Sequence, residues 1–289
     1  MKIGFIGLGR MGRPISFNLL KAGFHLCVFD VSKEALDPLA EKGAEVAKTI
    51  QSLAENSEIV ITCLPGPKEV GDVMEGQVLP AMGAGGIAID LSTVGPSTSL
   101  KHYKLFAQKK LSYLDAPISG GVEGAERANL AIMVGGDRPA FEEVQLIFKN
   151  IGRDIQYLGP SGSGNGMKLI IQLNYMCQLV AFFEGIALGD SLGLKLDDVF
   201  EVLSRSSARH PTIEKRYDKI RANDLKPRFE LRQIFKDLSL ARDLGKEHNL
   251  SVAAIEGTIE SLSRAINLGF GEKDAVALRT TNKNLNLKL

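Results

Sequence analysis

The sequence contains no tryptophan, only three cysteines and no excess of charge of either sign. Cys27, Cys63 and Cys177 are odd in number and far apart, which indicates reduced core thiols rather than a disulfide framework or a metal site. Because 35 Lys and Arg residues offset 34 Asp and Glu residues, the net charge of +1 gives no long-range attraction to nucleic acid or to an anionic membrane. We therefore expect neither as a partner, and we expect no metal.

Long uninterrupted apolar runs are also missing. Gly, Asp or Lys residues interrupt the apolar stretches before about 18 residues, the length that suggests a membrane-spanning helix. Residues 1–8 already form a strand that enters a glycine turn, so we expect no signal peptide and a cytoplasmic protein. The hydrophobic fraction of 44% and the charged fraction of 24% are typical of a globular protein, and 289 residues favour about two domains.

The first part of the chain alternates short apolar runs with amphipathic stretches. The predicted strands cover residues 2–6, 26–30, 59–64, 87–92 and 114–117, and the predicted helices include 14–22, 33–42 and 97–108. A further strand, helix and strand, at 131–135, 137–149 and 155–157, extend this pattern. Strands that alternate with helices predict an α/β domain of the Rossmann type, with a doubly wound, mostly parallel sheet.

A segment rich in Gly, Pro and Ser, residues 158–164, is the strongest break in the chain and divides it into domains 1–160 and 161–289. After the break the apolar spacing becomes helical. One long helix is predicted over 165–194, and further helices at 196–205, 214–222, 234–248 and 252–268. The second domain is therefore predicted to be all-helical, and its long apolar helix to be buried on several sides.

A glycine-rich turn follows the first strand and opens a helix: Gly7-Leu8-Gly9-Arg10-Met11-Gly12. The first two glycines permit a tight turn and close approach to a pyrophosphate, the third lets helix and strand pack, and the helix N-terminus favours negative charge. Asp30 ends the next strand at about the expected separation of 20 residues, where its carboxylate can accept hydrogen bonds from ribose hydroxyls. Without this context the glycines would indicate only a tight turn.

The same residues favour NAD over NADP, because the carboxylate of Asp30 would repel a 2′-phosphate. Lys33 or Arg10 could still reach such a phosphate, so NADP stays an alternative. We also expect Leu64 and Pro65, where a predicted strand ends, to contact the cofactor.

Several ordered segments make the chain resemble the β-hydroxyacid dehydrogenase family, which includes 3-hydroxyisobutyrate dehydrogenase, tartronate semialdehyde reductase and glyoxylate/succinic semialdehyde reductase. The resemblance covers essentially the whole chain. The segments that carry it are Gly4–Gly12, Asp90–Thr93, Asp115–Gly121, Gly162–Lys168 and Lys236–Leu238.

The resemblance implies that Lys168 donates or accepts the proton that accompanies hydride transfer. The residues themselves support this role, because Lys168 lies in the first turn predicted for the long helix, at the domain boundary. A helix N-terminus and an oxidised nicotinamide both disfavour a further positive charge, so we expect the pKa of Lys168 to fall toward the working pH. A lysine that extends from an apolar helix to solvent is the structural alternative.

The resemblance also implies a carboxylate site at Ser119, Gly120 and Gly121, which follow a predicted strand at the carboxyl end of the sheet. Backbone N–H groups and a hydroxyl can bind a small anion without a basic patch. Taken alone, Ser-Gly-Gly would indicate a plain turn.

Four more positions complete the implied site. Thr93 is similar to a family threonine near the nicotinamide, and Lys236 and Asp237 resemble a family pair beside the cofactor and the substrate. Many relatives carry Asn four residues after the catalytic lysine, whereas this chain has Gln172. Gln172 shares a helix face with Lys168, so its amide can still bond the substrate hydroxyl, although its greater length should move the substrate.

The segment 205–211 departs from the family, whose members often have a Gly-Ser-Trp type segment there. Arg209 or His210 could contact a second polar group of the substrate, and a surface helix–loop junction is the alternative.

The expected function is NAD-dependent hydride transfer to or from a short β-hydroxy acid, by a homodimer or homotetramer. The main alternative is an NADPH-dependent reductase of small semialdehydes, such as glyoxylate or the succinic or tartronate semialdehyde. An imine reductase is disfavoured because those enzymes usually lack the lysine found at 168. A non-catalytic cofactor-binding module is disfavoured because Thr93, Ser119, Lys168 and Lys236 are present together.

Overall fold

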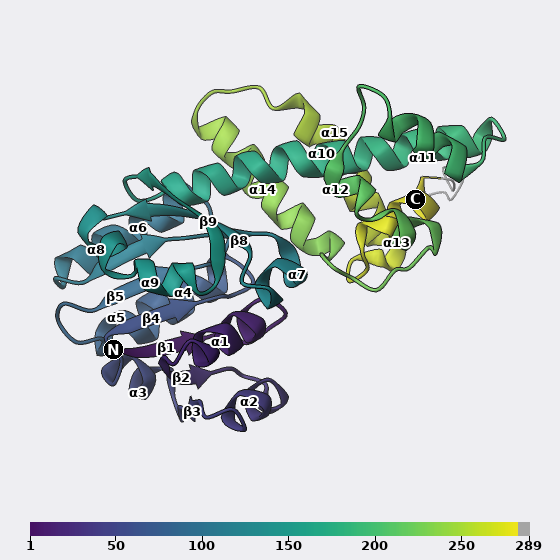
Figure 1. The fold of residues 1–289 in the computed structure, drawn as a ribbon. Coiled ribbons are helices and arrows are strands. Elements are labelled where there is room, and N and C mark those ends of the chain that lie inside the picture. Colours follow the sequence, from purple (N-terminus) through teal and green to yellow (C-terminus); the bar gives the residue numbers. More distant parts are fainter. Residues whose placement is uncertain (283–289) are drawn as a thin grey trace. The chain divides into compact units, whose positions relative to one another are not determined.

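The computed structural model describes residues 1–282, except for the side chain of Thr212. It divides into two compact units, Met1–Leu169 and the chain from Ile170 onward. The first unit is a nine-stranded sheet with helices, and the second is helical (Figure 1).

The sheet of the first unit has the strand order β3-β2-β1-β4-β5-β6-β8-β7, with β9 paired to β8. The strands are β1 Lys2–Ile6, β2 His25–Phe29, β3 Glu45–Val46, β4 Ile59–Thr62, β5 Ile87–Asp90, β6 Ser112–Asp115, β7 Ile118–Ser119, β8 Leu130–Gly136 and β9 Gly152–Gly159. Order 3-2-1-4-5-6 is that of a dinucleotide-binding sheet, in which ligands bind at the carboxyl ends of the strands near β1 and β4.

The first six strands are parallel, and the sheet then changes direction. β1 pairs with β2 and β4 in parallel, with Gly4 opposite both Cys27 and Val60. β8 runs antiparallel to β6 and β7, and β9 is again parallel to β8. The prediction of a doubly wound, mostly parallel sheet is confirmed.

Helices and one π-helical segment surround this sheet. They are α1 Gly12–Lys21, α2 Lys33–Ala40, α3 Ile50–Glu55, α4 Pro67–Val73, η1 Met74–Val78, α5 Leu79–Ala81, α6 Pro96–Gln108, α7 Gly121–Glu126, α8 Arg138–Glu143 and α9 Gln145–Lys149. Because successive side chains of a strand point to opposite faces, the sheet buries two cores. One contains Phe5 and Ile61 with residues of α1 and α9, and the other contains Val60 with residues of α3 and α6.

The long helix α10, Ser163–Ser191, begins in the first unit and continues into the second. Its other elements are α11 Leu196–Ser204, α12 Pro211–Glu214, α13 Tyr217–Arg221, α14 Leu231–Glu247, α15 Ala253–Ala265, η2 Ile266–Phe270, η3 Ala275–Ala277 and α16 Leu278–Thr281. The all-helical prediction is confirmed. The helix expected over 214–222 is interrupted, because α12 ends at Glu214 and α13 begins at Tyr217.

Helix α10 is long and apolar enough to cross a membrane by length and composition alone, with a mean hydropathy of 1.4 over its most apolar window. Because Gly and polar residues interrupt the apolar runs of α10, we expected no helix of this kind from the sequence. A single helix of this kind is weak evidence for a membrane span, because the core helix of a soluble protein passes the same test.

The start of α10 is held by a buried carboxylate at the end of β6. Asp115 Oδ1 accepts the backbone N–H of Gly162 at 2.8 Å, and Oδ2 accepts that of Asn165 at 2.8 Å. Both N–H groups lack a partner within the helix, so Asp115 caps α10 from another element. Asn165 in turn accepts N–H groups of Val94 and Gly95 on its Oδ1, at 2.9 and 3.1 Å.

We predict that Asp115→Asn changes how stability depends on pH. Burial raises the pKa of Asp115 to about 6, although the N–H groups of Gly162 and Asn165 lower it. A carboxyl whose pKa is higher in the folded chain binds its proton more tightly there, so its stabilisation is present below about pH 4 and is lost as the pH rises through about 6.

In urea unfolding, the free energy of unfolding of the wild type relative to Asp115→Asn should fall by about 2 to 3 kcal/mol between pH 4 and pH 7. Parallel curves for the two proteins over this range would show that the carboxyl titrates normally.

Candidate cofactor and substrate site

The glycine-rich turn joins β1 to α1, and the fold itself requires glycine at two of its three glycine positions. Gly7 has φ +95°, and a Cβ there would lie 2.4 Å from the carbonyl oxygen of Cys63. A Cβ on Gly12 would lie 1.9 Å from the carbonyl oxygen of Gly7, so helix and strand can pack only around glycine. A Cβ on Gly9 would meet no atom within 4 Å. Gly9 therefore faces open space at the N-terminus of a ten-residue helix.

Asp30 follows β2 and is tied to this turn. Its Oδ2 accepts the N–H of Leu8 at 2.6 Å, and its Oδ1 accepts the N–H of Ser32 at 2.8 Å. A carboxylate oxygen has more than one lone pair, so both oxygens can still accept a hydroxyl. Arg10 is exposed and Met11 half-buried in the turn beside it.

The ends of β4 and β5 carry the next predicted contacts, Leu64, Pro65 and Thr93. Leu64 donates its N–H to Ser92 Oγ at 2.9 Å, which ties the two strand-end turns together. Leu64 and Thr93 are half-buried, and Pro65 is exposed. These turns lie at the carboxyl edge of the sheet beside β1, where a dinucleotide binds in folds of this type.

Lys168 is buried, with 9% of its surface exposed, and its Nζ donates to the carbonyl oxygen of Ile118 at 2.9 Å. Ile118 directly precedes Ser119, Gly120 and Gly121, so the structure brings the predicted proton-transfer residue to the predicted carboxylate site. Lys168 is the sixth residue of α10 and therefore lies in its second turn, not in the first as expected from the sequence. The electrostatic effect of a helix N-terminus is weaker there.

The segment after Ile118 is a turn whose backbone conformation favours glycine. Gly120 and Gly121 have φ values of +139° and +66°, which favour glycine, and both residues are exposed. Ser119 is half-buried at the end of β7, with its backbone paired to Ala131 of β8. Successive N–H groups in such a turn can face a small anion.

In the second unit, Gln172 of α10 donates its amide N–H to Asp237 Oδ2 of α14. Asp237 Oδ1 lies 2.9 Å from Lys236 Nζ. Gln172 and Asp237 are both buried, whereas Lys236 keeps a quarter of its side chain exposed. The structure thus brings three predicted residues into one chain of polar contacts.

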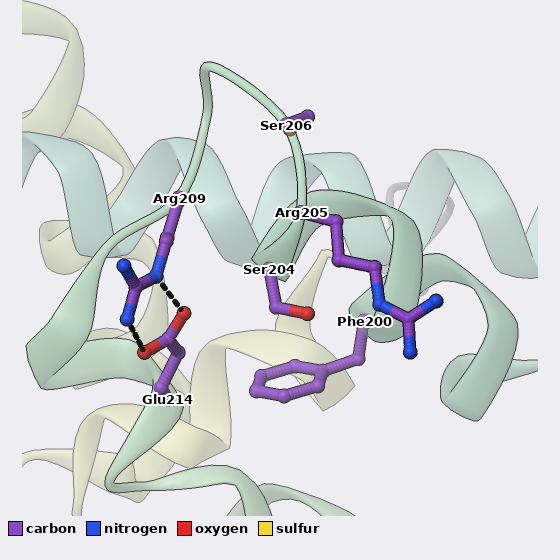
Figure 2. A pocket seen from close by; sticks show the side chains of 6 residues that line it. All are labelled: Phe200, Ser204, Arg205, Ser206, Arg209 and Glu214. Atoms are coloured by element: carbon purple, nitrogen blue, oxygen red, sulfur yellow. Dashed lines mark hydrogen bonds and ion pairs between the residues drawn. The ribbon is translucent and has the colours of Figure 1, made fainter.

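Arg209 and His210 lie on the loop between α11 and α12. Arg209 makes a two-pronged ion pair with Glu214, at 2.7 and 3.2 Å, at the edge of a surface hollow of about 600 Å³ (Figure 2). The ring of His210 lies against that of Tyr175, with centroids 5.8 Å apart. Tyr175 is one helical turn from Gln172, so His210 rather than Arg209 belongs to the neighbourhood of the predicted site.

Sequence reasoning missed two polar residues that organise this site, Asp115 and Asn165. Both residues lie in segments that carry the family resemblance, but the sequence suggested no role for either. Asp115 could have been found because it ends an apolar strand. A carboxylate buried at such a position must find hydrogen-bond donors.

The residues present fit a nicotinamide dinucleotide. The open space at Gly9, the N-terminus of α1 and the carboxylate of Asp30 supply room for a pyrophosphate, a favourable field and a ribose acceptor. Among residues 1–282 no group of three or more His, Cys, Asp or Glu residues could hold a metal ion. The three cysteines are free thiols.

Comparisons with known proteins place both parts of the chain. Residues 2–159 match the family model of the NAD binding domain of 6-phosphogluconate dehydrogenase, and residues 162–280 match that of the NAD-binding of NADP-dependent 3-hydroxyisobutyrate dehydrogenase.

Whole-chain relatives agree with these models. The chain is 38% identical over 281 residues to 2-(hydroxymethyl)glutarate dehydrogenase of Eubacterium barkeri, covering 96% of this chain and 93% of that one. It is 33% identical over 280 residues to glyoxylate/succinic semialdehyde reductase 1 of Arabidopsis thaliana, covering 96% and 97%. A solved Mycobacterium tuberculosis 3-hydroxyisobutyrate dehydrogenase with L-serine is similar with a TM-score of 0.89 and 27% identity, covering 97% and 98%.

We predict that Gly9→Ala and Gly12→Ala fail in different ways. The Cβ at position 12 collides with backbone, so Gly12→Ala should unfold several kcal/mol more easily. The Cβ at position 9 meets no protein atom, so Gly9→Ala should fold normally but bind dinucleotide at least about tenfold more weakly, because it fills space next to the pyrophosphate.

Urea unfolding and titration of reduced-dinucleotide fluorescence measure the two effects. Gly257→Ala, whose Cβ also meets nothing within 4 Å, is the matched control and should show neither. Normal dinucleotide affinity in Gly9→Ala would place the pyrophosphate elsewhere.

Proposed function

The chain belongs to the β-hydroxyacid dehydrogenase family, and on that premise we propose that Lys168 is the proton-transfer residue for NAD-dependent oxidation of a short β-hydroxy acid. The protein is an NAD(P)-dependent oxidoreductase that acts on hydroxy acids or semialdehydes. Bound nicotinamide supplies the hydride acceptor or donor. The protein's own residues must bind the substrate, orient it and move one proton.

The hydrogen bond from Lys168 Nζ to the carbonyl of Ile118 is the single observation that carries this proposal. A protonated lysine has three donors, so an ammonium group held by the carbonyl of Ile118 can also donate to a substrate hydroxyl. When the amine is neutral it can accept the hydroxyl proton while the carbonyl keeps it in place. General acid–base catalysis needs such a group within hydrogen-bond reach of the reacting oxygen.

The carboxylate of the substrate would bind to Ser119, Gly120 and Gly121. Ile118 connects this segment to Lys168, so a carboxylate bound there places the β-carbon of a short acid near the amine. Thr93 would contact the nicotinamide, as its position after β5 suggests. This arrangement holds a small anion in a protein of almost zero net charge.

Gln172 would orient the substrate hydroxyl. Its N–H group is directed to Asp237, which leaves the amide oxygen as the group available to accept a hydroxyl. Asp237 also faces Lys236, so one carboxylate fixes both side chains. Lys236 would then be positioned toward the nicotinamide and the substrate.

We favour NAD over NADP as the working cofactor. Asp30 is held in place by Leu8 and Ser32, so its negative charge stays where a 2′-phosphate would have to lie.

The cofactor contacts would be the turn 7–12, Asp30, Leu64, Pro65 and Thr93 in the first unit, and Lys236 and Asp237 in the second. An NADPH-dependent reductase of semialdehydes is the second candidate, favoured by the likeness to the Arabidopsis reductase.

The domain bounds, the cellular location and the oligomeric state are also proposals. We propose a cofactor domain over 1–160, a substrate and oligomerisation domain over 161–289, a cytoplasmic location and a homodimer or homotetramer. The assembly would use the exposed apolar side chains of the second unit, above all Leu188 and Leu192 of the α10 region, which are 62% and 69% exposed. Apolar side chains clustered on a surface favour burial against another protein.

We predict that Lys168→Ala lowers turnover by at least about a hundredfold with near-normal dinucleotide affinity, because only the proton transfer is lost. A screen of short hydroxy acids and semialdehydes in both directions, followed by nicotinamide absorbance, measures turnover and identifies the working cofactor. Lys104→Ala, which removes an exposed lysine of α6, is the matched control. Turnover of Lys168→Ala within threefold of wild type would exclude the proposed role.

For the assembly, Leu188→Lys combined with Leu192→Lys should lower the mass measured by light scattering to that of a monomer or a smaller oligomer, since buried charges oppose association. Leu146→Lys changes a leucine of the first unit that is 60% exposed and should leave the mass unchanged. An unchanged mass in the double variant would move the interface to another face.

A further inference from the structure

A row of polar groups runs inward from η1, where Glu75 is half-buried, to the end of β5. Glu75 Oε1 lies 3.0 Å from His102 Nε2, His102 Nδ1 lies 3.4 Å from the hydroxyl of Tyr113, and that hydroxyl lies 3.4 Å from Asp90 Oδ2. Asp90, His102 and Tyr113 are each 0% exposed. The row lies in the first unit and has no part in the proton transfer assigned to Lys168.

The number of protons shared by Glu75, His102, Tyr113 and Asp90 follows from the hydrogen-bond donors that their contacts need. Although burial raises the pKa of Glu75, hydrogen bonds from Lys101 and His102 lower it overall, so Glu75 is a carboxylate and Nε2 carries a proton. The Tyr113 hydroxyl has one proton, because burial, reinforced by Asp90 and Asp115, raises its pKa well above the usual value. That single proton can satisfy either Asp90 or His102 Nδ1, and the other contact needs a proton of its own.

Two states satisfy every contact, and both contain the same extra proton. In the first, His102 Nδ1 donates to the Tyr113 oxygen and the hydroxyl donates to an ionised Asp90. In the second, the proton has moved from Nδ1 to the Tyr113 oxygen as the hydroxyl proton moved to Asp90 Oδ2, so histidine and carboxyl are both neutral. In each state the charges of His102 and Asp90 sum to zero, which avoids an uncompensated charge in the interior.

We propose that Asp90, Tyr113 and His102 share one buried proton, and that His102 is a positioning residue for the cofactor through it. When alkaline solution removes this proton, Asp90 is left as a buried carboxylate without a compensating cation. Burial already raises the pKa of Asp90, against hydrogen bonds from Ser92 and Thr62 that lower it.

Asp90 connects the shared proton to the turns at the ends of β4 and β5. Its Oδ1 accepts the N–H of Ser92 at 3.0 Å and the hydroxyl of Thr62 at 2.8 Å. Ser92 Oγ in turn accepts the N–H of Leu64 at 2.9 Å. An uncompensated charge on Asp90 is costly and can be relieved only if these strand ends move to admit water or other donors. Dinucleotide binding to the turns would then weaken.

The other charged and titratable groups near the row do not replace the missing cation. Cys63 of the neighbouring turn stays a neutral thiol, since burial and then Asp90 raise its pKa to about 12. Asp115 on β6 acts on Tyr113 with the same sign as Asp90. Lys101 lies on α6 but pairs with Glu75 at 2.7 Å, at the outer end of the row. His102 is the basic side chain that contacts Tyr113 directly.

The test is the pH dependence of dinucleotide binding, measured by fluorescence of the reduced dinucleotide between pH 6 and 10. In the wild type the dissociation constant should rise by up to about tenfold per pH unit once the shared proton leaves. In His102→Gln only Asp90 can hold that proton, so the rise should begin at least about one pH unit lower. In Asp90→Asn, whose amide mimics the protonated acid, the rise should disappear.

Tyr103→Phe is the matched control. It removes a phenolic hydrogen bond from the same helix, that to Asp137 at 2.8 Å, without touching the row. Its pH profile should follow the wild type. Where binding to the wild type weakens with rising pH, a His102→Gln profile that follows the wild type would overturn the proposal.

Nuclear magnetic resonance of the cofactor-free wild type keeps the proposal testable if His102→Gln does not fold. The ring nitrogens of His102 and the carboxyl carbon of Asp90 should report a shared proton at pH 7, and the amides of Leu64 and Ser92 should shift as it leaves. A neutral His102 of one tautomer beside an ionised Asp90 at pH 7 would refute the inference. The inference rests on the proposed cofactor position but not on Lys168: if the amides shift while binding does not change, that cofactor position is wrong.

Discussion

The carboxylate of Asp115 accepts two backbone N–H groups at the start of α10, and the position of Lys168 depends on these two bonds. They join the end of a central strand to a 29-residue helix at its first turn. A helix begins where its free N–H groups find acceptors, so a carboxylate supplied by the sheet sets where α10 starts. Asn165 reinforces the junction by binding the backbone that follows Thr93.

From this junction the geometry of the site follows in short steps. Lys168 is one and a half turns along the helix, and Ile118 is three residues along the chain from Asp115. The hydrogen bond between Lys168 and Ile118 forms a second link between α10 and the segment that follows β6. The same buried groups therefore set the positions of Lys168, of the turn at Gly120 and Gly121, and of the turn after β5. The two places where the sequence departs from the family resemblance, Gln172 and the segment 205–211, both lie in the second unit.

The local features of the fold were predictable from the sequence, and the long-range ones were not. The glycine turn and Asp30 were predictable because strand, turn, helix and strand follow one another within thirty residues. The reversal of β8 was not, because pairing to β6 rather than continuation of the parallel order depends on contacts across the sheet. Lys168 was expected in the first helical turn because the helix start was judged from composition, whereas Asp115 sets it from fifty residues away. The row from Glu75 to Asp90 could not be foreseen either, since it needs the register that places Tyr113 opposite Ala88 and the packing of α6 on that face.

The proposed function requires that the amine at position 168, held by Ile118, exchanges a proton with the substrate. Chemical rescue measures this exchange: small primary amines are added to Lys168→Ala and turnover is followed by nicotinamide absorbance. Turnover should rise in proportion to the free-base amine concentration and vary with amine basicity, as general acid–base catalysis requires. Turnover that is insensitive to every amine, in a variant that still binds dinucleotide and substrate, would contradict it.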